Sequence, residues 1–507
     1  MSRLVVVSNR VAAADGAPSG GLSVAMAAAL QGEPALWFGW SGERTAHFDG
    51  RLGRRQLGNI EVVTVDLEDA DFDEYYNGYA NAALWPIFHS RTDLAAYDRS
   101  FSEGYARVNR RFAEALAPLL RPDDLVWVHD YHLIPLGREL RRLGFAGPIG
   151  FFLHIPWPAP QLFTTLPQHR DLVAALFAYD LVGMQTQECV TAFEAYVTAE
   201  AGGVLEGGRL RAFGGQVRAQ AFPIGLDTDD FLALTRSAAA YRTYDRMSAH
   251  GVFRSLMVGV DRLDYSKGIP ERLLGFEHYL KTHPDMVRKV LYLQIAPSSR
   301  AEVEAYQTLR ANVLALAGRI NATWAEMDHA PVLCVNRNYT RAELAGVYRA
   351  ARVGLVTPLR DGMNLVAKEY VAAQDPEDPG VLILSRFAGA ARQMKDALIV
   401  NPYAREELAE AIAQALAMGQ AERVRRWESL MAGVTHDNVN AWRDDFIAAL
   451  TAAHGAPSPE AERPRPARFT LGRGLVSAVT PLRETPDPLS GRDSASSKPG
   501  WRTTVQG

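Results

Sequence analysis

The chain has 507 residues, which is too many for one ordinary hydrophobic core, so two or more domains are expected. It is 48% hydrophobic and 22% charged with a net charge of −4, which argues against a general nucleic-acid binder and a basic membrane-surface protein. Its two cysteines lie far apart and belong to no Cys/His cluster, which argues against a disulfide framework or a structural zinc site and favours a reducing compartment.

The first part of the chain alternates short β-branched runs with longer helical patterns. The opening run, RLVVVS, is too short for a secretion signal and is broken by Asn9 and Arg10, so it predicts a buried strand. No stretch approaches the roughly 20 apolar residues that a membrane span needs, and a cytoplasmic location is expected. Strands are predicted over residues 3–8, 60–66, 124–129, 149–154 and 179–185, and helices over 101–120, 132–144 and 186–200.

A second series of the same kind follows a polar stretch at residues 226–252. Near-continuous apolar strands that alternate with helices predict parallel sheets covered on both faces. Two such series predict an α/β protein with two doubly wound, Rossmann-like domains, which we expect at residues 1–245 and 246–455. The second series has predicted strands over 253–260, 289–296, 331–336, 351–358, 380–385 and 397–402, and helices over 269–283, 300–318, 340–351 and 404–418.

The last 52 residues, 456–507, hold eight of the chain's 28 prolines, with eight basic and five acidic residues and no periodic apolar pattern. Such a composition predicts a disordered, proline-rich tail that belongs to neither domain. The tail is too short, and lacks a DxDGT motif, to be a fused phosphatase.

Ligands of open parallel sheets bind at the carboxyl ends of the strands, so we expect most binding and catalytic residues directly after the predicted strands. After the first strand come Arg10 and the pair Gly20 and Gly21, which open an alanine-rich helix. Adjacent glycines let backbone N–H groups approach a ligand, and a helix N-terminus favours an anion. The spacing is not GxGxxG, and a flexible connector with a solvated arginine explains these residues equally well.

The motif WVHDYHLIP follows the predicted strand at residues 124–129. His129, Asp130 and His132 invite a metal interpretation, but H-D-x-H matches no zinc pattern of known mechanism, and no metal is expected. We favour an aspartate that accepts hydrogen bonds from a hydroxylated or cationic ligand. His154 ends the next strand, and it either shares this crevice or caps the proline-rich turn that follows.

The segment DEYYNGYANAALWPIFH, residues 73–89, is rich in aromatic residues and shows neither a strand period nor a helix period. Long loops with rings such as Tyr76, Trp85 and Phe88 either seal the edge of a core or line a sugar site. Core packing is the commoner use of such rings.

Basic residues follow the first two strands of the second series. Arg262 and Lys267 lie five residues apart across a turn and together suit a phosphate or pyrophosphate. A salt-bridged loop is the alternative, because Asp261 and Asp264 could neutralise both bases. Arg300 follows the next strand, in the motif IAPSSR.

The stretch TPLRDGMNLVAKEYVAAQ, residues 357–374, joins a strand to a helix. Gly362 permits close approach, and the amides from Met363 onward point at an anion at the positive end of the helix. Asp361 precedes the helix, where it can accept hydrogen bonds from sugar hydroxyls, and either Asp361 or Asn364 is expected to cap it.

Together the strand ends predict a cleft for a phosphorylated and hydroxyl-rich pair of ligands. Two carboxylates could also serve a glycosidase, but so many bases fit the hydrolysis of a neutral glycoside less well. The bases are Arg10, Arg262, Lys267 and Arg300, and the carboxylates are Asp130, Asp361 and Glu369.

These motifs, taken together, resemble those of the trehalose-6-phosphate synthases, a family of retaining glycosyltransferases. The resemblance covers nearly all of residues 1–455. It implies GT-B architecture, with two Rossmann-like domains that face each other across a cleft and a last helix that can pack back on the first domain. It is carried by RLVVVSNR, GGL, LWFGWSGE, DEYYN, LWPIFH, WVHDYHL, GFFLHIPWP, DRLDYSKGIPER, QIAPSSR and VGLVTPLRDGMNLVAKEYVAAQ.

The resemblance implies transfer of glucose from a nucleotide-glucose, usually UDP-glucose, to glucose 6-phosphate, in trehalose biosynthesis and stress or osmoprotection. It implies no metal, no cofactor, and a homo-oligomer, either a dimer or a tetramer. Because no nucleophile is evident, it also implies a front-face route in which the leaving phosphate helps to deprotonate the acceptor hydroxyl. A non-catalytic regulatory relative is the alternative, and the presence of the pyrophosphate-binding and sugar-holding residues favours the enzyme.

The resemblance also implies roles for single residues. Acceptor binding falls to Arg10, Tyr76, Trp85, Asp130 and Arg300. Donor binding falls to Gly20, Gly21, Arg262, Lys267, Tyr339, Asp361, Gly362, Met363, Asn364, Leu365, Val366 and Glu369, with Glu369 on the ribose. The catalytic set is Asp361, Arg262, Lys267 and His154, the last of these near the reacting carbon.

Overall fold

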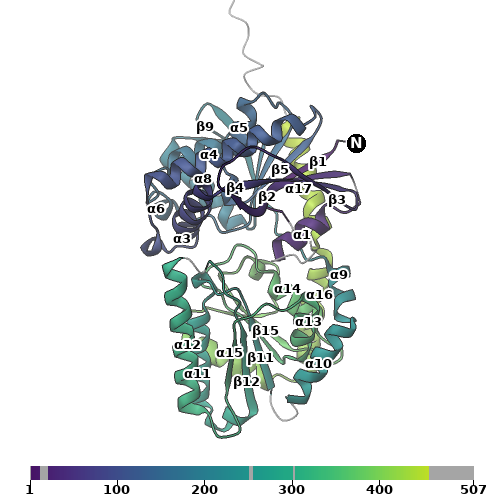
Figure 1. Cartoon of the computed structure of the whole chain (residues 1–507). Coiled ribbons are helices and arrows are strands. Elements are labelled where there is room, and N and C mark those ends of the chain that lie inside the picture. The colour runs from purple at the N-terminus through teal and green to yellow at the C-terminus, as the bar shows by residue number, and fades with distance from the viewer. Residues whose placement is uncertain (1, 12–20, 33, 251–254, 301–302, 456–507) are drawn as a thin grey trace, which may run out of the picture. The chain divides into compact units, whose positions relative to one another are not determined.

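The structure, a computed structural model, describes residues 2–11, 21–32, 34–250, 255–300 and 303–455. The described residues form two α/β lobes, each built around one sheet (Figure 1). Both the predicted tail and Gly20 lie outside the described residues. Among the described residues, no helix combines the length and the apolar character that crossing a membrane requires.

The first lobe contains a ten-stranded sheet in the order β3-β4-β2-β1-β5-β6-β7-β10-β9-β8. Its central strands pair in parallel, while β3, β9 and β8 pair antiparallel with their neighbours at the two edges. The strands are β1 (Leu4–Arg10), β2 (Ala35–Thr45), β3 (Gly53–Leu57), β4 (Ile60–Glu68), β5 (Leu125–His129), β6 (Ile149–Leu153), β7 (Leu181–Met184), β8 (Val204–Glu206), β9 (Arg209–Ala212) and β10 (Gly215–Ala221).

The second lobe contains a six-stranded sheet in the order β13-β12-β11-β14-β15-β16, and every pair in it is parallel. The order reverses between β11 and β14, so a ligand is expected at the carboxyl ends of these two strands. The strands are β11 (Ser255–Val260), β12 (Val290–Ile295), β13 (Val332–Val335), β14 (Val353–Val356), β15 (Val381–Ser385) and β16 (Leu398–Val400).

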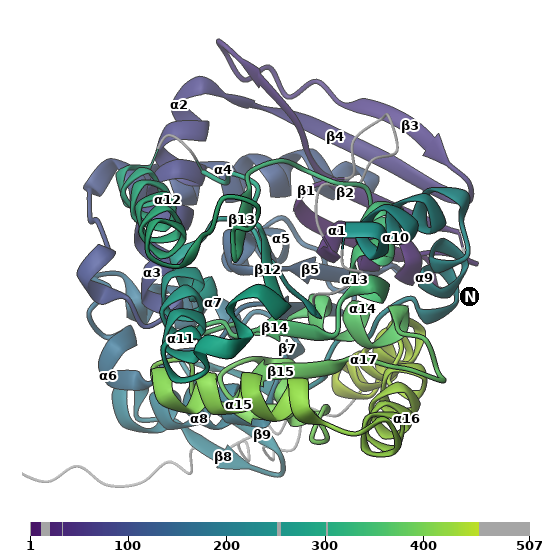
Figure 2. The same ribbon diagram turned by 90° about the horizontal axis from the view of Figure 1, so that it is seen from below.

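Helices cover both faces of each sheet, as the buried strands require. In the second lobe, α11, α12 and α15 cover one face and α10, α13, α14 and α16 the other (Figures 1 and 2). The helices of the first lobe and the crossover are α1 (Gly21–Ala29), α2 (Asp69–Asp71), α3 (Trp85–Phe88), α4 (Arg99–Leu116), α5 (Leu136–Arg142), α6 (Pro160–Phe163), α7 (His169–Leu176), α8 (Gln187–Ala201), α9 (Thr228–Thr235) and α10 (Ala238–His250). The later helices are α11 (Ile269–Thr282), α12 (Glu304–Trp324), α13 (Arg341–Ala350), α14 (Leu365–Ala373), α15 (Arg405–Ala417), α16 (Gln420–His436) and α17 (Val439–His454). Short 3-10 turns occur at Thr92–Leu94, Ala117–Leu119, Tyr131–Leu133, Tyr265–Lys267, Pro284–Lys289 and Gly389–Arg392.

The alternation of side chains along β1 explains how one strand serves two cores. Val5 and Val7 join the core under α4, α5 and α8, whereas Val6 faces the opposite side, where α1 and α17 pack. All three are fully buried. The same division holds in β11, where Met257 and Val258 point into different clusters.

The chain crosses between the lobes twice. After β10 it passes through residues 222–227 into the second lobe, and after α16 it returns through residues 437–438 to α17. Trp442, Phe446 and Leu450 of α17 pack on the first sheet against Trp127 and Phe152. The last described helix therefore completes the core of the first lobe.

All eleven predicted strands are present, but the segment after β4 differs from the expected loop. Residues Asp69–Phe88 form one helical run, of which Phe72–Leu84 is a π-helix. A π-helix makes i→i+5 hydrogen bonds, so its side chains do not follow the 3.6-residue period. The strand β2 was also missed, because its second half, SGERT, is polar.

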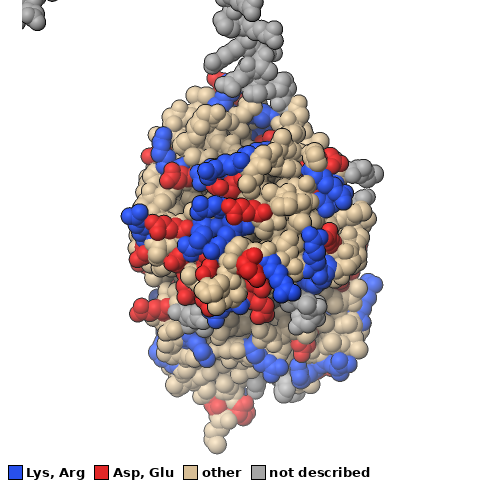
Figure 3. Space-filling view, turned by 45° about the horizontal axis from the view of Figure 1, so that its top comes forward, with Lys and Arg blue, Asp and Glu red and all other residues tan. Residues whose placement is uncertain are grey.

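Basic and acidic side chains are interspersed over the face of the molecule shown in Figure 3. On the surface of the first lobe, ion pairs such as Arg54 with Glu61 and Arg99 with Glu103 join side chains of opposite charge. No large area of one charge stands out on this face.

Candidate active site

The carboxyl ends of β1, β5 and β6 in the first lobe and of β11, β12 and β14 in the second lobe come together, and we call this region the strand-end junction. Several direct contacts join the lobes there. The Trp85 indole Nε1 donates to Asp264 Oδ1 over 3.4 Å, and Arg300 Nη2 donates to the Tyr131 hydroxyl over 3.3 Å. The backbone of Gly362 lies against the His154 carbonyl. The predicted site residues of both lobes therefore belong to one region.

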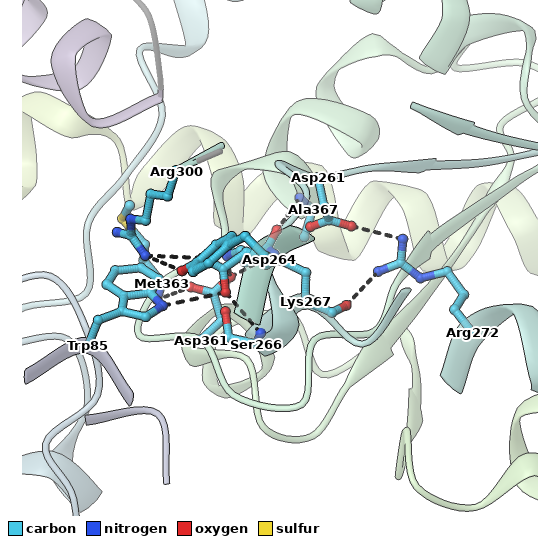
Figure 4. A network of polar contacts seen from close by, with 12 residues as sticks. Trp85, Asp261, Asp264, Ser266, Lys267, Arg272, Arg300, Asp361, Met363 and Ala367 are labelled. Atoms are coloured by element: carbon cyan, nitrogen blue, oxygen red, sulfur yellow. Dashed lines mark hydrogen bonds and ion pairs between the residues drawn. The ribbon is translucent and has the colours of Figure 1, made fainter. Parts of the chain in front are cut away.

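The centre of the second-lobe side is an ion pair between Lys267 and Asp361 (Figure 4). Lys267 Nζ lies 2.5 Å from Asp361 Oδ2, and the two side chains are 14% and 9% exposed. Burial alone would raise the pKa of Asp361, but the nearby Lys267 ammonium and its hydrogen bond outweigh this and lower the pKa below its ordinary value. Asp361 is therefore an ionised acceptor at the mouth of β14.

Asp361 also organises the start of α14. Its Oδ1 accepts from the Met363 amide over 3.3 Å, and its Oδ2 accepts from Asn364 Nδ2 over 3.1 Å. Asn364 in turn caps the helix, because its Oδ1 accepts from the Ala367 amide over 3.1 Å. Of the two caps predicted, Asp361 or Asn364, the structure has Asn364, and the free amides of the first helical turn make this end favourable for an anion.

The glycine at position 362 is required by close approach. A Cβ built there would lie 2.2 Å from the His154 carbonyl oxygen and 2.8 Å from the backbone of Ile155. No side chain fits between these two backbones, so the contact between the lobes at this point requires glycine.

The Gly362→Ala variant is expected to lose about 1–3 kcal/mol of stability or to move the lobes apart, because the methyl group overpacks a backbone contact. Urea unfolding measures the first outcome, and small-angle scattering measures the second. The matched control is Gly433→Ala in α16, where a Cβ meets nothing within 4 Å, and which should be neutral or gain up to about 1 kcal/mol. Equal effects of the two substitutions would contradict this account of the junction.

A second buried carboxylate, Asp264, accepts hydrogen bonds from residues of both lobes (Figure 4). Its Oδ2 lies 3.3 Å from Arg300 Nη1 and accepts from the Tyr306 hydroxyl over 2.9 Å, while its Oδ1 accepts from the Ser266 amide over 2.9 Å and from Trp85. Burial would raise the pKa of Asp264, but the charges of Arg300 and Arg262 hold it well below its ordinary value.

Arg300 also stacks on the ring of Trp85. Its guanidinium lies 4.0 Å from the centre of the Trp85 ring, which places a cation over an aromatic face. It also hydrogen-bonds the Tyr306 hydroxyl. Arg262 is exposed, and its guanidinium lies 5.8 Å from the centre of the same ring, so two arginines lie near Trp85 at the junction.

The pairing of charges differs from the salt-bridged loop considered from the sequence. Asp264 forms an ion pair with Arg300, and Asp261 Oδ2 lies 2.8 Å from the Nη1 of the buried Arg272. Lys267 pairs with Asp361 instead. Neither Asp261 nor Asp264 forms an ion pair with Arg262 or Lys267, so these two bases are not neutralised by their own loop.

The first-lobe side is built around Asp130 and His154. Asp130 has φ 73°, and its Oδ1 accepts from the His154 amide over 3.2 Å. Burial raises the pKa of Asp130 to about 6, while the backbone hydrogen bonds and the charges of Arg262 and Arg300 act in the opposite direction. The carboxyl group thus lies within electrostatic reach of both arginines.

The imidazole of His154 faces inward. Its Nε2 lies 3.0 Å from His129 Nδ1 and its Nδ1 lies 3.3 Å from Gln185 Nε2, and the ring packs near Trp442. Burial lowers the pKa of His154 to about 3, so the ring is neutral. In this structure the backbone of His154, rather than its ring, makes the contact with the second lobe.

Arg10 lies at the outer end of the junction. Its guanidinium is 5.4 Å from the Trp40 ring, and Trp40 contacts Tyr76, which stacks on His132 at 6.0 Å. His132 contacts Tyr131, the partner of Arg300. A continuous path of rings therefore connects the two arginines predicted to hold one phosphate.

The donor-side residues farther along α14 have different exposures. Met363, Val366 and Glu369 are half-buried, and Leu365 is buried. Burial raises the pKa of Glu369 to about 7, and its Oε2 accepts from the Tyr348 hydroxyl over 3.4 Å. Tyr339 is half-buried beside Arg337, and Gly21 is the first residue of α1.

Backbone strain collects at the junction. Among the described residues, five non-glycine residues have positive φ, and three of them are Asp130, Arg300 and Asn364, at 73°, 48° and 80°. Such conformations cost energy and cluster at functional sites, so their position at three different strand ends supports a binding role.

The HDYH motif does not form a metal centre. His129 faces His154, Asp130 faces the His154 amide, and His132 stacks between tyrosines. In the part of the chain that the structure describes, no three His, Cys, Asp or Glu side chains are arranged to hold a metal ion.

Four functional candidates were missed from the sequence: Asp264, Arg272, Trp40 and Lys368. Arg272 is fully buried, where it donates to Thr357 and Gln294 and supports the loop of Lys267 through the Lys267 carbonyl. Its signal was present, because a charged residue on the apolar face of a predicted helix is rare unless it is paired.

Comparison with known proteins gives consistent matches along the chain. The model of glycosyltransferase family 20 matches residues 8–452. A trehalose-6-phosphate synthase of Sinorhizobium fredii is 48% identical over 459 residues, 89% of this chain and 99% of that protein. One from Klebsiella pneumoniae is 45% identical over 470 residues, 92% of this chain and 98% of that protein.

Solved structures match equally well. A UDP-forming α,α-trehalose-phosphate synthase from Burkholderia xenovorans, in complex with glucose 6-phosphate, has a TM-score of 0.86 at 47% identity and covers 89% of this chain and 100% of that chain. A protein from E. coli bound with UDP-2-fluoro glucose has a TM-score of 0.85 at 44% identity and covers 89% of this chain and 99% of that chain.

Proposed function

The chain belongs to glycosyltransferase family 20, and we propose that its strand-end junction moves glucose from UDP-glucose to glucose 6-phosphate. The chain is an enzyme that forms trehalose 6-phosphate, in agreement with relatives that are 44–48% identical over most of its length. The predicted GT-B architecture is confirmed by the two mostly parallel sheets and by the structural matches. The donor base and the part played by each residue are our proposal.

The observation that carries the donor assignment is the Lys267–Asp361 pair at the start of α14. Asp361 is ionised and able to accept hydrogen bonds from glucose hydroxyls, while Lys267, Arg262 and the first amides of α14 can hold the pyrophosphate. Glu369 lies one turn deeper and would accept from the ribose. Leu365, Val366 and Tyr339 would meet the nucleotide, with Gly20 and Gly21 beside the phosphates.

The acceptor assignment places the phosphate of glucose 6-phosphate between Arg10 and Arg300. Arg300 is already desolvated and oriented by Asp264 and Trp85, so its planar fork is ready for a phosphate. Tyr76 belongs to the path of rings between the two arginines and Asp130 lies within electrostatic reach of Arg300, and both would bind the acceptor sugar. Trp85 lies near one arginine proposed for the acceptor, Arg300, and one proposed for the donor, Arg262.

We propose a front-face transfer with retention. The bond between the donor C1 and the UDP oxygen breaks, the acceptor O1 forms the new bond to C1 on the same face, and the acceptor proton passes to the leaving phosphate oxygen. Negative charge grows on UDP as it leaves, and Lys267, Arg262 and the α14 amides stabilise it. Contact between the lobes at Gly362 and His154 would exclude water and so favour transfer over hydrolysis.

The test of the proposed function mixes purified protein with UDP-, GDP- or ADP-glucose, with and without glucose 6-phosphate. We expect release of nucleoside diphosphate that depends on glucose 6-phosphate, is fastest with UDP-glucose, and needs no added metal. Release of free glucose without an acceptor would point to hydrolysis, and no turnover with any donor would point to a regulatory protein. Either outcome would overturn the proposal.

The raised pKa of Glu369 predicts a pH dependence of donor binding. A ribose hydroxyl donates best to an ionised carboxylate, so acidification from pH 8 to pH 6, through a pKa of about 7, should weaken donor binding. At pH 6 about one tenth of this group is ionised, which predicts a rise in the KM for UDP-glucose of about 10-fold. Initial rates at saturating glucose 6-phosphate measure it.

The Glu369→Gln variant should show a high KM for UDP-glucose that changes little with pH. Glu422→Gln, at an exposed ion pair on α16, is the control and should keep the wild-type profile. A pH profile that survives in Glu369→Gln would assign the titration to another group.

We also propose a cytoplasmic location and a homo-oligomeric state. Both cysteines of the chain are unpaired, which agrees with a reducing compartment. The oligomer is proposed from the family resemblance alone, and sedimentation of the purified protein would test it.

A further inference from the structure

The two segments of the chain that cross between the lobes contact each other. The Val439 amide donates to the Leu226 carbonyl over 3.1 Å, and the Thr228 hydroxyl donates to the Val434 carbonyl over 3.2 Å. A Cβ built on Gly225 would lie 2.1 Å from the backbone of Asn438, so the two crossing segments touch without room for a side chain. Any motion of one lobe against the other must bend both crossings at this point.

A buried lysine joins the donor-side helix to both crossings. Lys368 of α14 is 3% exposed, and its Nζ donates to the Ile224 carbonyl over 2.7 Å and to Gln393 Oε1 over 2.8 Å. Gln393 Nε2 then donates to Asp437 Oδ2 over 2.7 Å. Lys368 therefore contacts the outward crossing directly and the return crossing through one glutamine.

The first lobe holds the same peptide segment from its own side. The Ile224 amide donates to Gln185 Oε1 over 3.0 Å, and Gln185 Nε2 lies 3.3 Å from His154 Nδ1. Residue 224 is thus fixed through its N–H by the first lobe and through its C=O by Lys368 of the second lobe. This arrangement links the strand-end junction to the crossings by a continuous set of polar contacts.

We propose that Lys368 is a positioning residue that couples occupation of the donor site to the crossing between the lobes. The inference rests on the proposed function, because α14 is the helix that would carry the donor. Lys368 adjoins Glu369 in sequence but uses its ammonium on backbone and amide oxygens at the crossings. A ligand that shifts the start of α14 would therefore move the Ile224 and Asp437 contacts with it.

The placement of this charge supports a positioning role over a merely structural one. Burial lowers the pKa of Lys368 to about 8, with the Asp437 carboxylate opposing the shift. A methionine would fill the same space without desolvating a charge, so an ammonium here serves the contacts that it makes. Those contacts join three segments that are otherwise far apart in the chain.

Hydrogen exchange and kinetics of Lys368→Met test the proposal, with UDP as the probe ligand. In the wild type, UDP should slow exchange both at the start of α14 and at residues 222–227 and 436–439. In Lys368→Met, the slowing at α14 should remain and that at the crossings should be lost. The kcat should fall about 5- to 150-fold, the range of typical coupling energies, while the KM for UDP-glucose changes less than about 3-fold.

Two further variants keep the test decisive. Gln393→Leu removes the link to Asp437 while leaving the contact of Lys368 with Ile224 in place, so it should lose the slowing of exchange at residues 436–439 and lower kcat even if Lys368→Met folds poorly. Lys281→Met, which removes a 54% exposed lysine from α11, is the matched control and should behave as the wild type. UDP-dependent protection of the crossings that persists in both linkage variants, or its absence in the wild type, would overturn the proposal.

Failure of the two proposals can be told apart. If the wild type binds UDP but forms no trehalose 6-phosphate, the proposed function is wrong and the exchange experiment still tests the coupling. If the wild type turns over while Lys368→Met and Gln393→Leu keep its kcat and its exchange pattern, the coupling is wrong and the function stands.

Discussion

Replacement of Asp361 by asparagine is expected to lower kcat/KM for UDP-glucose by about 10²- to 10³-fold, the cost typical of removing one preorganised polar group from a transition-state site. Asp361 is the ionised partner of Lys267 and accepts from the Met363 amide and from Asn364. An amide in its place keeps the shape but loses the charge that orients Lys267 toward the leaving phosphate. Initial rates of UDP release at varied donor concentration measure the change.

Asp375→Asn is the matched control for this variant. Asp375 also pairs with an arginine, Arg349, but it is 47% exposed and lies at the far end of α14. Exposed pairs contribute little, so its rate should stay within about 2-fold of the wild type. Wild-type rates in Asp361→Asn would show that the donor assignment is wrong.

The Arg300→Gln variant is expected to raise the KM for glucose 6-phosphate at least about 30-fold, because loss of one partner of a desolvated charge pair costs about 2–5 kcal/mol. Its effect should fall on the phosphate, so weak turnover of unphosphorylated glucose as acceptor should change far less. The ratio of kcat/KM for the two acceptors is the decisive measurement, since it cancels any general loss of folded enzyme.

The control for Arg300→Gln is Arg319→Gln, which removes a 50% exposed arginine that pairs with Glu277 on the surface of the second lobe. This variant should keep the wild-type preference for glucose 6-phosphate. If Arg300→Gln keeps the preference as well, the acceptor phosphate binds elsewhere, and the ring path between Arg10 and Arg300 is packing only.

The fold could be predicted because both sheets are buried on both faces. Strands such as Val353–Val356 and Val381–Ser385 are buried throughout and nearly all apolar, and the helices between them keep a clear period. The run at Phe72–Leu84 could not be recognised, since a π-helix places its aromatic residues at a wider spacing than the pattern searched for. β2 was hidden because only its first half is buried.

The residues of the candidate site could be predicted from their positions after strands, but the ion pairs and hydrogen bonds that they form could not. Arg262, Lys267 and Arg300 follow buried strands, and this placement alone marks them. Two aspartates in the same loop allow several ion pairs. Only the folded chain shows that Asp264 forms its ion pair with Arg300, a residue 36 positions away. The Lys368 contact had no signature in the sequence, because its partner is a backbone carbonyl 144 residues away.

The packing of α17 has a consequence for synthesis of the chain. Trp442, Phe446 and Leu450 cover the face of the first sheet that holds Trp127 and Phe152, yet they are made after the whole second lobe. While the ribosome is still adding residues 228–438, the part of that face around Trp127 and Phe152 lacks the cover that α17 later supplies. The first lobe can therefore complete its core only after the second lobe has been made, and during that interval it exposes apolar surface that a chaperone could cover.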